Sequence, residues 1–396
     1  MKDQFKEILI PDRMGTNSRK WDNLAEHFER GDLLPMWIAD MDFKAPECVR
    51  QALHDYVDQG AFGYYRTPDA YFDNFIRWEE SHHGYRVQRE WIRFSPGVVC
   101  CLHWLVSILT RPGDAVLLQT PVYYPFHKAV TDTGRVLIEN PLINDHGRYS
   151  IDFADFERQI AENNVRAFIM SSPHNPVGRV WSKDELKQML DICLKHGVYV
   201  LSDEIHQDIL LHGAKHTPSA TLGDYDGILI TLCAASKTFN LAGGQNSYII
   251  IPDAALRRKY DDLMKYLRVF SGNSFGYVAA EAAFGGGEEW LKAVLEEIEG
   301  NFDYLNDNLV AEFPKLELSP LQGTYLSWLD LGGYVPFSDL HRFVEQECRI
   351  APDYGEWFWP GRKVEDCHIR LNLATPRCNV EEAASRIAEA LRNYKQ

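Results

Sequence analysis

The sequence lacks the features of a membrane, secreted or zinc-binding protein. It contains no uninterrupted run of about 18 apolar residues. The opening MKDQFKEILIPDR is mixed and polar, not a charged-then-apolar leader. Its eight cysteines are scattered, and none forms a CxxC pair. We therefore expect a cytoplasmic protein with reduced thiols, and neither a disulfide framework nor a structural zinc site.

Basic residues are also fewer than acidic ones. There are 41 Lys and Arg residues against 57 Asp and Glu, which gives a net charge of −16. This balance argues against nucleic acid or an anionic membrane as a partner, and a small anionic substrate would need local basic groups. Internal repeats and low-complexity linkers are absent from the sequence as well. With 396 residues and 45% hydrophobic content, the chain can bury a large core, and its length favours two or three domains.

One stretch, CAASKTFNLAGGQ from Cys233 to Gln245, stands out as a place for chemistry. The apolar run from Gly227 to Cys233 predicts a fully buried strand, and Lys237 follows just after it. Desolvation drives a lysine amine toward its neutral form, which can condense with a carbonyl to give a Schiff base. The alternative is a lysine that merely extends its charge into water at the end of a strand.

The middle of the chain alternates between strands and helices. Four further segments predict buried strands: Ala115–Gln119, Val136–Glu139, Arg166–Met170 and Val198–Ser202. Between them we expect a helix over Phe153–Asn163, and another that a capping box of Ser182 and Glu185 opens and Gly197 ends. Such alternation predicts an α/β fold with a mainly parallel sheet covered by helices, and ligands of these sheets bind beyond the carboxyl ends of the strands. Four candidate site residues follow predicted strands: Tyr123, Asn175, Asp203 and Lys237.

A glycine turn, Ser95–Val99, precedes an apolar helical run at Leu102–Leu109. The first amides of a helix have no partner within the helix, and the helix dipole favours negative charge there. We expect the amides of Val98 and Val99 to bind an anion.

The ends of the chain predict a smaller second domain. We expect helices over Glu288–Leu309, Asp339–Cys348 and Val380–Leu391 and a strand over Thr324–Leu329. A helix is also expected over Pro46–Gln59. Gly285–Gly287 is interpreted as a hinge between domains or a plain loop, and the adjacent His82 and His83 as a solvated pair rather than a metal site.

Several segments resemble those of fold-type I enzymes that use pyridoxal phosphate. In chain order they are DRMGTNSRKWD, MWIADMDF, FGY, SPHNPVG, SDEIH, SKTFNLAGGQ and HIRLNLATPR. Together they are similar to the class I/II aminotransferase-like carbon–sulfur lyases, in the cystathionine β-lyase and cysteine-S-conjugate β-lyase branch. The resemblance implies an α/β large domain with a mainly parallel seven-stranded sheet, and a smaller α+β domain. We expect an N-terminal arm with part of the small domain at 1–47, the large cofactor domain at 48–285 and the small C-terminal domain at 286–396.

The resemblance also implies how pyridoxal 5'-phosphate is held. Lys237 binds its aldehyde and is the catalytic residue, while Asp203 pairs with the ring nitrogen. Asn175 contacts the ring hydroxyl and Tyr123 stacks on the ring. The remaining cofactor contacts implied are Val98, Val99, His206, Ser236 and, across a homodimer interface, Tyr64. Two positions depart from common family patterns, since His206 replaces a tyrosine and Gln245 replaces an arginine on the phosphate.

For the substrate, the resemblance implies a pocket bordered by Ala39, Asp40 and Tyr124. Asn175 helps to seat the substrate carboxylate, which Arg370 binds through its planar fork of donors. Lys237 then acts as a general base on the α-proton. Elimination on L-cystathionine or another cysteine S-conjugate would give a thiol, pyruvate and ammonia. An aminotransferase on the same scaffold, and a regulatory protein that keeps the fold, are the alternatives.

Overall fold

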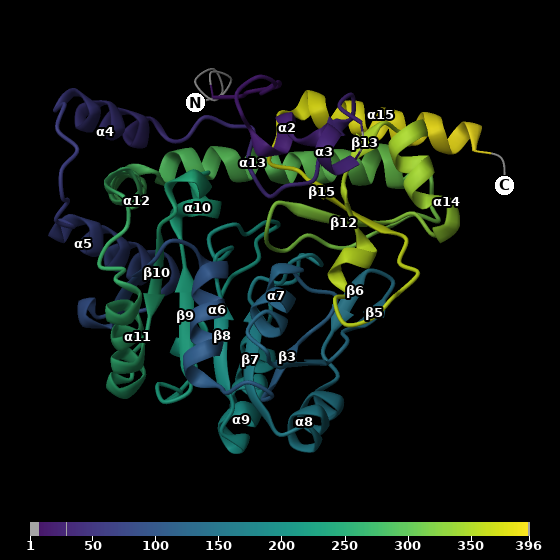
Figure 1. The fold of residues 1–396 in the computed structure, drawn as a ribbon. Helices are drawn as coiled ribbons and strands as arrows, with labels where there is room; N and C mark the ends of the chain where they lie inside the picture. Colours follow the sequence, from purple (N-terminus) through teal and green to yellow (C-terminus); the bar gives the residue numbers. More distant parts are fainter. Residues whose placement is uncertain (1–7, 29, 395–396) are drawn as a thin grey trace.

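A seven-stranded sheet forms the framework of the computed structural model, which describes residues 8–28 and 30–394 (Figure 1). Its strands, in spatial order, are β2 (Ile92–Ser95), β10 (Ser247–Ile250), β9 (Leu229–Cys233), β8 (Tyr199–Asp203), β7 (Val165–Ser171), β3 (Ala115–Leu118) and β4 (Val136–Glu139). From β9 to β4 all neighbours are parallel, and β10 runs antiparallel to both β2 and β9. The predicted mainly parallel sheet is confirmed.

Helices cover both faces of this sheet, because successive side chains of a strand point to opposite faces. Ile249 packs with one group of helices, whereas its neighbours Tyr248 and Ile250 pack with another. The first face carries α6 (Val98–Leu109), α7 (Pro125–Thr131) and α11 (Ala254–Leu267). The second carries α8 (Phe153–Glu162), α9 (Lys183–His196), α5 (Asp69–Trp78) and α12 (Ser274–Gly286). Burial on two faces explains why the central strands are continuous apolar runs in the sequence.

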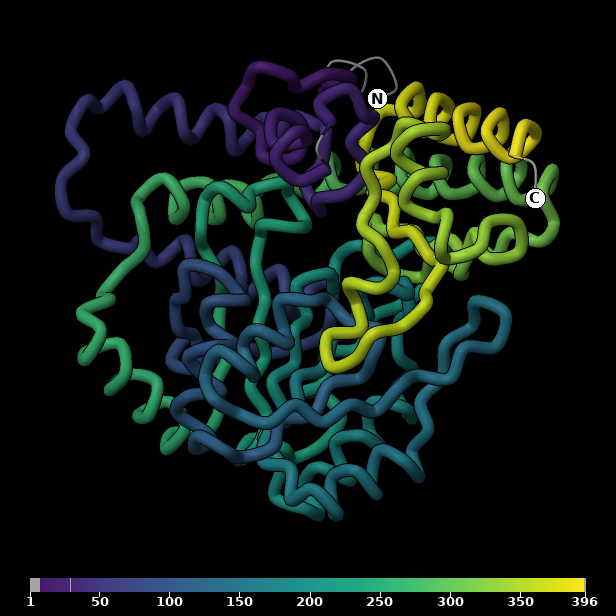
Figure 2. The backbone as a smooth tube through the Cα atoms, turned by 45° about the vertical axis from the view of Figure 1, so that its right-hand side comes forward, coloured from purple at the N-terminus to yellow at the C-terminus, as the bar shows by residue number. Residues whose placement is uncertain are grey.

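A second, smaller unit, coloured green to yellow, lies above the teal part of the chain that contains most of the sheet (Figure 2). Its antiparallel sheet has the order β11 (Glu317–Leu318), β12 (Leu326–Asp330), β15 (His368–Asn372) and β14 (Asp353–Tyr354). Its helices are α13 (Glu288–Leu305), α14 (Phe337–Arg342) and α15 (Arg377–Asn393). The predicted α+β unit is thus present, while the domain boundaries at 47 and 285 stay a prediction.

The N-terminal arm joins this smaller unit. Its strand β1 (Leu34–Pro35) pairs in parallel with β13 (Ile350–Ala351), so the arm is joined to a segment far along the chain. Two short helices precede β1, α2 (Arg19–Asp22) and α3 (Leu24–Phe28), and α4 (Glu47–Asp58) follows it. The remaining short elements are β5 (Ile143–Asp145), β6 (Arg148–Ser150), α10 (Ala235–Thr238), and the 3₁₀ turns η2 (Arg89–Trp91), η3 (Ser219–Thr221), η4 (Ala242–Gly244) and η7 (Gly355–Phe358).

Some predicted boundaries differ from the structure for local reasons. The predicted helix from Glu288 ends at Leu305 and continues as a wider π-helical turn, η5 (Asn306–Val310). The same happens after α14, which passes into η6 (Phe343–Glu347). The hydrophobic spacing cannot distinguish these turns from α-helix over one turn. The three glycines from Gly285 form no loop, since α12 runs to Gly286 and α13 begins at Glu288.

The interpretation of His82 and His83 as a solvated pair is wrong for His83. Its side chain lies in η1 (Glu79–His83), is almost fully buried, and its Nε2 is 2.7 Å from Oδ1 of Asp208. Burial lowers the pKa of His83, but the hydrogen bond to Asp208 and the carboxylate charges around it raise it on balance. Glu79 is fully buried beside this pair, and burial raises its pKa to about 8. This cluster was not predictable from local patterns, because its partners come from distant segments.

Candidate active site

Four adjacent strands of the sheet, β9, β8, β7 and β3, end at one cavity of about 250 Å³. Because these strands are parallel, the residues that follow them meet at the same edge. The structure brings Tyr123, Asn175, Asp203 and Lys237 together there, as the positions after predicted strands implied. Of the other predicted site residues, the cavity is lined by Ala39, Val98, Val99, His206 and Ser236.

Lys237 lies in α10, directly after β9, and its side chain points into the cavity rather than to the outer surface. Its Nζ donates a hydrogen bond to the carbonyl oxygen of Ala39 at 2.7 Å. Burial lowers the pKa of Lys237 to about 8, and the nearby Arg370 acts in the same direction, while Asp40 and Asp203 partly oppose the shift. A substantial share of the amine is therefore neutral near physiological pH, as a Schiff-base lysine requires.

Asp203 is the last residue of β8 and is 6% exposed. Its Oδ1 accepts a hydrogen bond from the amide of Ile205 at 3.1 Å, and no described Lys, Arg or His side chain lies within ion-pair distance. Burial raises the pKa of Asp203 to about 7. A buried carboxyl without a cationic partner is suited to pair with a cationic ring nitrogen of a ligand.

His206 lies one helical turn from Asp203 on the same loop and is 4% exposed. Burial lowers its pKa well below the usual value, so the imidazole is neutral at pH 7. Within the described part of the chain, its Nδ1 is buried and has no hydrogen-bond partner. The ring therefore has a free polar atom at the wall of the cavity.

Arg370, in β15, is fully buried behind Asn175 and does not itself line the cavity. Its Nη1 donates to Oδ1 of Asn175 at 2.8 Å, and its guanidinium lies 4.9 Å from the ring centre of Phe358. Asp353 stands opposite Arg370 in the pairing of β14 with β15, and its carboxylate accepts from Nη2. The Nε of Arg370 has no partner among the described residues. Asn175 thus connects the arginine to the cavity.

Another part of the cavity can bind an anion through backbone amides rather than through a cationic side chain. It is formed by Gly97 and by the first residues of α6, Val98 and Val99, with Ser236 and Gln245. The amides at the start of this helix have no partner in the helix, and the helix dipole favours negative charge. These donors fit a phosphate.

The remaining predicted residues lie outside the cavity lining. Asp40 pairs with Arg13, with Nη1 and Oδ2 at 3.1 Å, and Tyr124 is 36% exposed. Tyr64 is fully exposed on the surface of the single chain. The sequence analysis did not anticipate Ile205, Asn246 and Ser247, which also line the cavity. Ile205 follows Asp203 by two residues, but an apolar residue in a loop carries no signal of its own.

Among residues 8–28 and 30–394, none of the helices combines the length and the apolar composition of a membrane span, and His, Cys, Asp and Glu side chains form no group of three that could hold a metal ion.

Comparison with known proteins assigns the chain to a class. A family model described as aminotransferase class I and II matches residues 32–387. The chain is 41% identical to cystathionine beta-lyase PatB of Bacillus subtilis, over 96% of this chain and 98% of that one. Among solved structures, a PLP-bound putative aminotransferase from Clostridium difficile is 40% identical with a TM-score of 0.92, covering 98% of this chain and 99% of that one. A PLP-bound C-S lyase from Staphylococcus hominis is 34% identical with a TM-score of 0.89, covering 96% and 97%.

The fold and the cavity therefore define a pyridoxal-phosphate enzyme of the aminotransferase-like fold, and the predicted fold class and cofactor are confirmed. The chain belongs to the class I and II aminotransferase family. Within that family it is a carbon–sulfur lyase, as its full-length similarity to the lyases indicates, which confirms the predicted class of enzyme.

Proposed function

We propose that this lyase acts on L-cystathionine or another cysteine S-conjugate and releases a thiol, pyruvate and ammonia with consumption of one water. The observation that carries the proposal is the cavity lined by Lys237, with a pKa of about 8, by Asp203 and by Asn175, to which Arg370 is hydrogen-bonded. The B. subtilis relative with this activity in its name is similar along its full length.

The residues at the cavity fit the cofactor. Lys237 would hold its aldehyde, and Asp203 would pair with the ring nitrogen and keep it protonated. The amides of Val98 and Val99, with Ser236, would hold the phosphate, while Tyr123 and Asn175 would contact the ring and its hydroxyl. When bound, the cofactor supplies an electron sink for the substrate carbon that loses its proton.

The substrate would be oriented by its α-carboxylate. The guanidinium of Arg370 offers a planar fork, and the bond to Asn175 fixes the direction in which the fork faces. Ala39, Asp40 and Tyr124 would border the space for the side chain. The amine of Lys237 then removes the α-proton, and the electron pair of the Cβ–S bond leaves with the sulfur as a thiolate.

The test begins with the colour of the purified protein. Borohydride reduction should attach the chromophore covalently to the peptide that contains Lys237, and mass spectrometry identifies that peptide. In Lys237→Ala this covalent adduct should be absent. With cystathionine, the wild-type enzyme should form pyruvate without any added amino acceptor. Strict dependence on an α-keto acid acceptor would contradict the proposal and support the aminotransferase alternative, which the similarity to the C. difficile structure favours.

A homodimer with shared active sites is part of the same proposal. Tyr64 has no role within one chain, since it is fully exposed. Exposed aromatic side chains lie nearby in the structure: Phe62 and Phe275 contact each other, with ring centres 5.7 Å apart. A patch of this kind is typical of an interface. Light scattering of the holoenzyme should give the mass of two chains, and a monomer would contradict the proposal.

A cytoplasmic location also belongs to the proposal. All eight cysteines are free, which fits a reducing compartment.

The third alternative, a regulatory protein without turnover, requires that no thioether amino acid be converted at all, so an assay with a panel of S-substituted cysteines would test it.

A further inference from the structure

The segment Ile38–Phe43 is irregular, yet the carbonyl groups along it are hydrogen-bonded by other parts of the chain. The Ile38 and Asp40 carbonyls accept from Nδ2 of Asn372, at 2.6 and 2.8 Å. The Ala39 carbonyl accepts both from Nζ of Lys237 at 2.7 Å and from the hydroxyl of Tyr325 at 3.0 Å. The irregular backbone is held in place in this way, because three successive carbonyls are each bonded by a side chain from another part of the chain.

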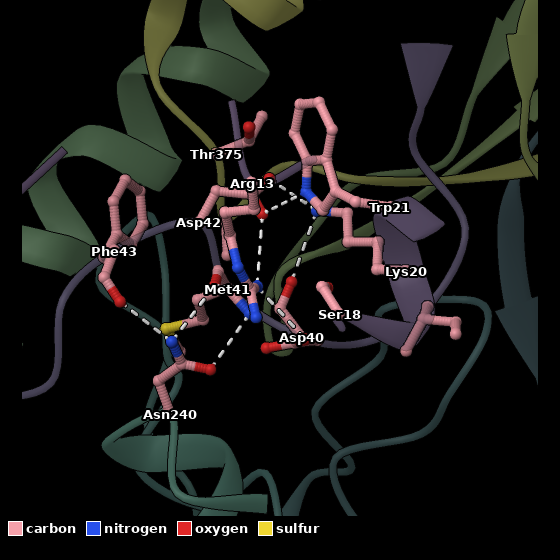
Figure 3. Close-up of polar contacts among 12 residues, drawn as sticks. Arg13, Ser18, Lys20, Trp21, Asp40, Met41, Asp42, Phe43, Asn240 and Thr375 are labelled. Carbon is pink, nitrogen blue, oxygen red and sulfur yellow. Dashed lines mark hydrogen bonds and ion pairs between the residues drawn. The ribbon is translucent and has the colours of Figure 1, made fainter. Parts of the chain in front are cut away.

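Asn240 attaches the segment to the turn that carries Lys237 (Figure 3). Its Oδ1 accepts from the amide of Met41 at 3.1 Å, and its Nδ2 donates to the carbonyls of Met41 and Phe43 at 3.0 and 2.9 Å. Asn240 has a φ of 58°, in the left-handed region that asparagine tolerates better than most residues. Three contacts from one side chain therefore tie the segment to a position three residues after Lys237.

The N-terminal arm holds the same segment from the other side, as Figure 3 shows. Lys20 forms a fully buried ion pair with Asp42, with Nζ and Oδ2 at 2.6 Å, and Nε1 of Trp21 donates to the same carboxylate at 2.8 Å. Nη1 of Arg13 donates to the Met41 carbonyl at 3.0 Å. The segment Ile38–Phe43 thus contacts the N-terminal arm, the turn that carries Lys237 and the smaller unit. We call this segment the joint.

We infer that this joint positions the base of the reaction: the Ala39 carbonyl, held in place by Asn240 and Tyr325, binds Nζ of Lys237 when that nitrogen carries a proton. Asn240 and Tyr325 are positioning residues, since neither lines the cavity. The inference rests on the proposed function, because it assigns the acceptor that receives the protonated lysine during that reaction.

The contact has a consequence for the outcome of the reaction. In elimination, Lys237 keeps the α-proton while the thiolate leaves. In transamination with the cofactor bound, the proton held by Lys237 would instead go to the carbonyl carbon of the cofactor. Hydrolysis by one water would then release the substrate as an α-keto acid that keeps its sulfur, and the amino group would stay with the cofactor. A carbonyl that binds the ammonium restrains it from this delivery, so the joint favours elimination.

The test removes the Asn240 contacts without straining the backbone. Asn240→Gly keeps the left-handed conformation accessible, and Asn240→Asp keeps the acceptor for the Met41 amide but loses both donated bonds. The matched control is Asn301→Ala, which also removes three contacts of a buried asparagine, to Leu373, Thr375 and Arg377. All proteins are checked for native circular dichroism.

Two measurements are made on each protein. In the apoprotein, the rate of labelling of Lys237 by an amine reagent is followed against pH by mass spectrometry. In the holoenzyme with cystathionine, pyruvate is compared with the amine form of the cofactor. For Asn240→Gly we expect the labelling midpoint to move to lower pH, because the ammonium has lost a firm acceptor, whereas in Asn240→Asp the added carboxylate charge opposes that shift. For both variants we expect the ratio of transamination to elimination to rise about tenfold.

The control should leave both quantities at their wild-type values. If the ratio is unchanged in either Asn240 variant, if the midpoint is unchanged in Asn240→Gly, or if Asn301→Ala changes both quantities equally, the inference is wrong. Failure of the proposed function has a different signature: the wild-type enzyme itself would form no pyruvate without an acceptor, and the labelling of the apoprotein would still report on the joint.

Discussion

Asn175 and Arg370 join the two units of the molecule through one hydrogen bond of 2.8 Å, in which Nη1 of Arg370 donates to the amide oxygen of Asn175. Asn175 follows β7 of the large sheet, whereas Arg370 belongs to β15 of the smaller sheet. Arg370 is therefore connected to the cavity through Asn175 only when the two sheets are correctly placed. If Arg370 binds the substrate carboxylate as proposed, substrate binding depends on the placement of the smaller unit.

The fork of Arg370 leads to a first prediction. Arg370→Lys should lower kcat/KM for cystathionine by about 100-fold, because a lysine cannot bond Asn175 and a carboxylate in one plane and leaves Asp353 poorly paired. Steady-state kinetics measures the loss. Arg362→Lys, at a half-exposed pair with Glu139, is the control and should change little. Equal kinetics in the two variants would contradict the role of Arg370.

The lowered pKa of Lys237 predicts selective labelling of the wild-type apoprotein. Since burial brings this pKa to about 8, the neutral amine predominates above that pH, and labelling should be half-maximal near pH 8. Lys187 is an internal control on the same chain, because a hydrogen bond to Asp191 raises its pKa above the usual 10.5. A midpoint for Lys237 as high as that of Lys187 would show that the amine is solvated.

The buried Glu79 predicts a pH-dependent stability. Its pKa is raised from 4.5 to about 8 by burial, so the folded protein holds a proton that the unfolded chain releases between these values. Its contribution to stability is complete below pH 4.5 and is lost as the pH rises toward 8. Glu79→Gln should remove this loss.

Chemical denaturation at pH 5 and pH 8 measures the effect. The free energy of unfolding of the wild type should fall relative to that of Glu79→Gln by on the order of 3 kcal/mol between the two pH values. Glu80→Gln changes the neighbouring residue, which pairs with Arg86 on the surface, and should show no such dependence. A parallel change in all three proteins would refute the buried proton.

A close approach of two glycines predicts that bulk at Gly276 weakens cofactor binding. A Cβ on Gly276 would overlap the carbonyl oxygen of Gly244, just before Gln245 at the phosphate end of the cavity. Gly276→Ala should therefore shift this turn and cost about 1 to 3 kcal/mol in stability, with weaker cofactor affinity by titration. Gly243→Ala has open space around its Cβ and should bind the cofactor normally.

The assignment of Tyr64 to a partner's site can be tested by mixing defects. In a heterodimer of Tyr64→Ala and Lys237→Ala chains, one site would have both wild-type residues if Tyr64 acts across the interface. Two affinity tags isolate this heterodimer, and its specific activity should be about half that of the wild type. Activity as low as in the two parent homodimers would place Tyr64 outside the partner's site.

The large sheet and the residues at its edge could be predicted from local sequence patterns. The strands β3, β7, β8 and β9 are each part of an apolar run long enough to recognise, and the parallel arrangement then requires Asp203 and Lys237 to meet. The capping box at Ser182 was also predictable, because both of its partners lie within four residues. Here the physical cause of the structure is contained in a short segment.

Contacts between distant segments could not be predicted in this way. Lys20 is a charged residue in a polar arm and Asp42 one in a mostly apolar segment, and nothing local indicates that they are buried against each other. His83 was misinterpreted for the same reason, since Asp208 is 125 residues away. Tyr325 and Asn240 have positions that only the folded chain brings to the segment Ile38–Phe43.

The order of the strands has a consequence for how the enzyme matures. All seven strands of the large sheet lie between Ile92 and Ile250, whereas the partner of β1 is β13, at Ile350. During synthesis the strands of the sheet are complete before the last third of the chain has been made, but the arm has no strand to pair with until Ile350 emerges. The segment with Lys237 and the start of α6 are thus available early in a nascent chain, whereas the smaller unit can be completed only when translation is nearly finished.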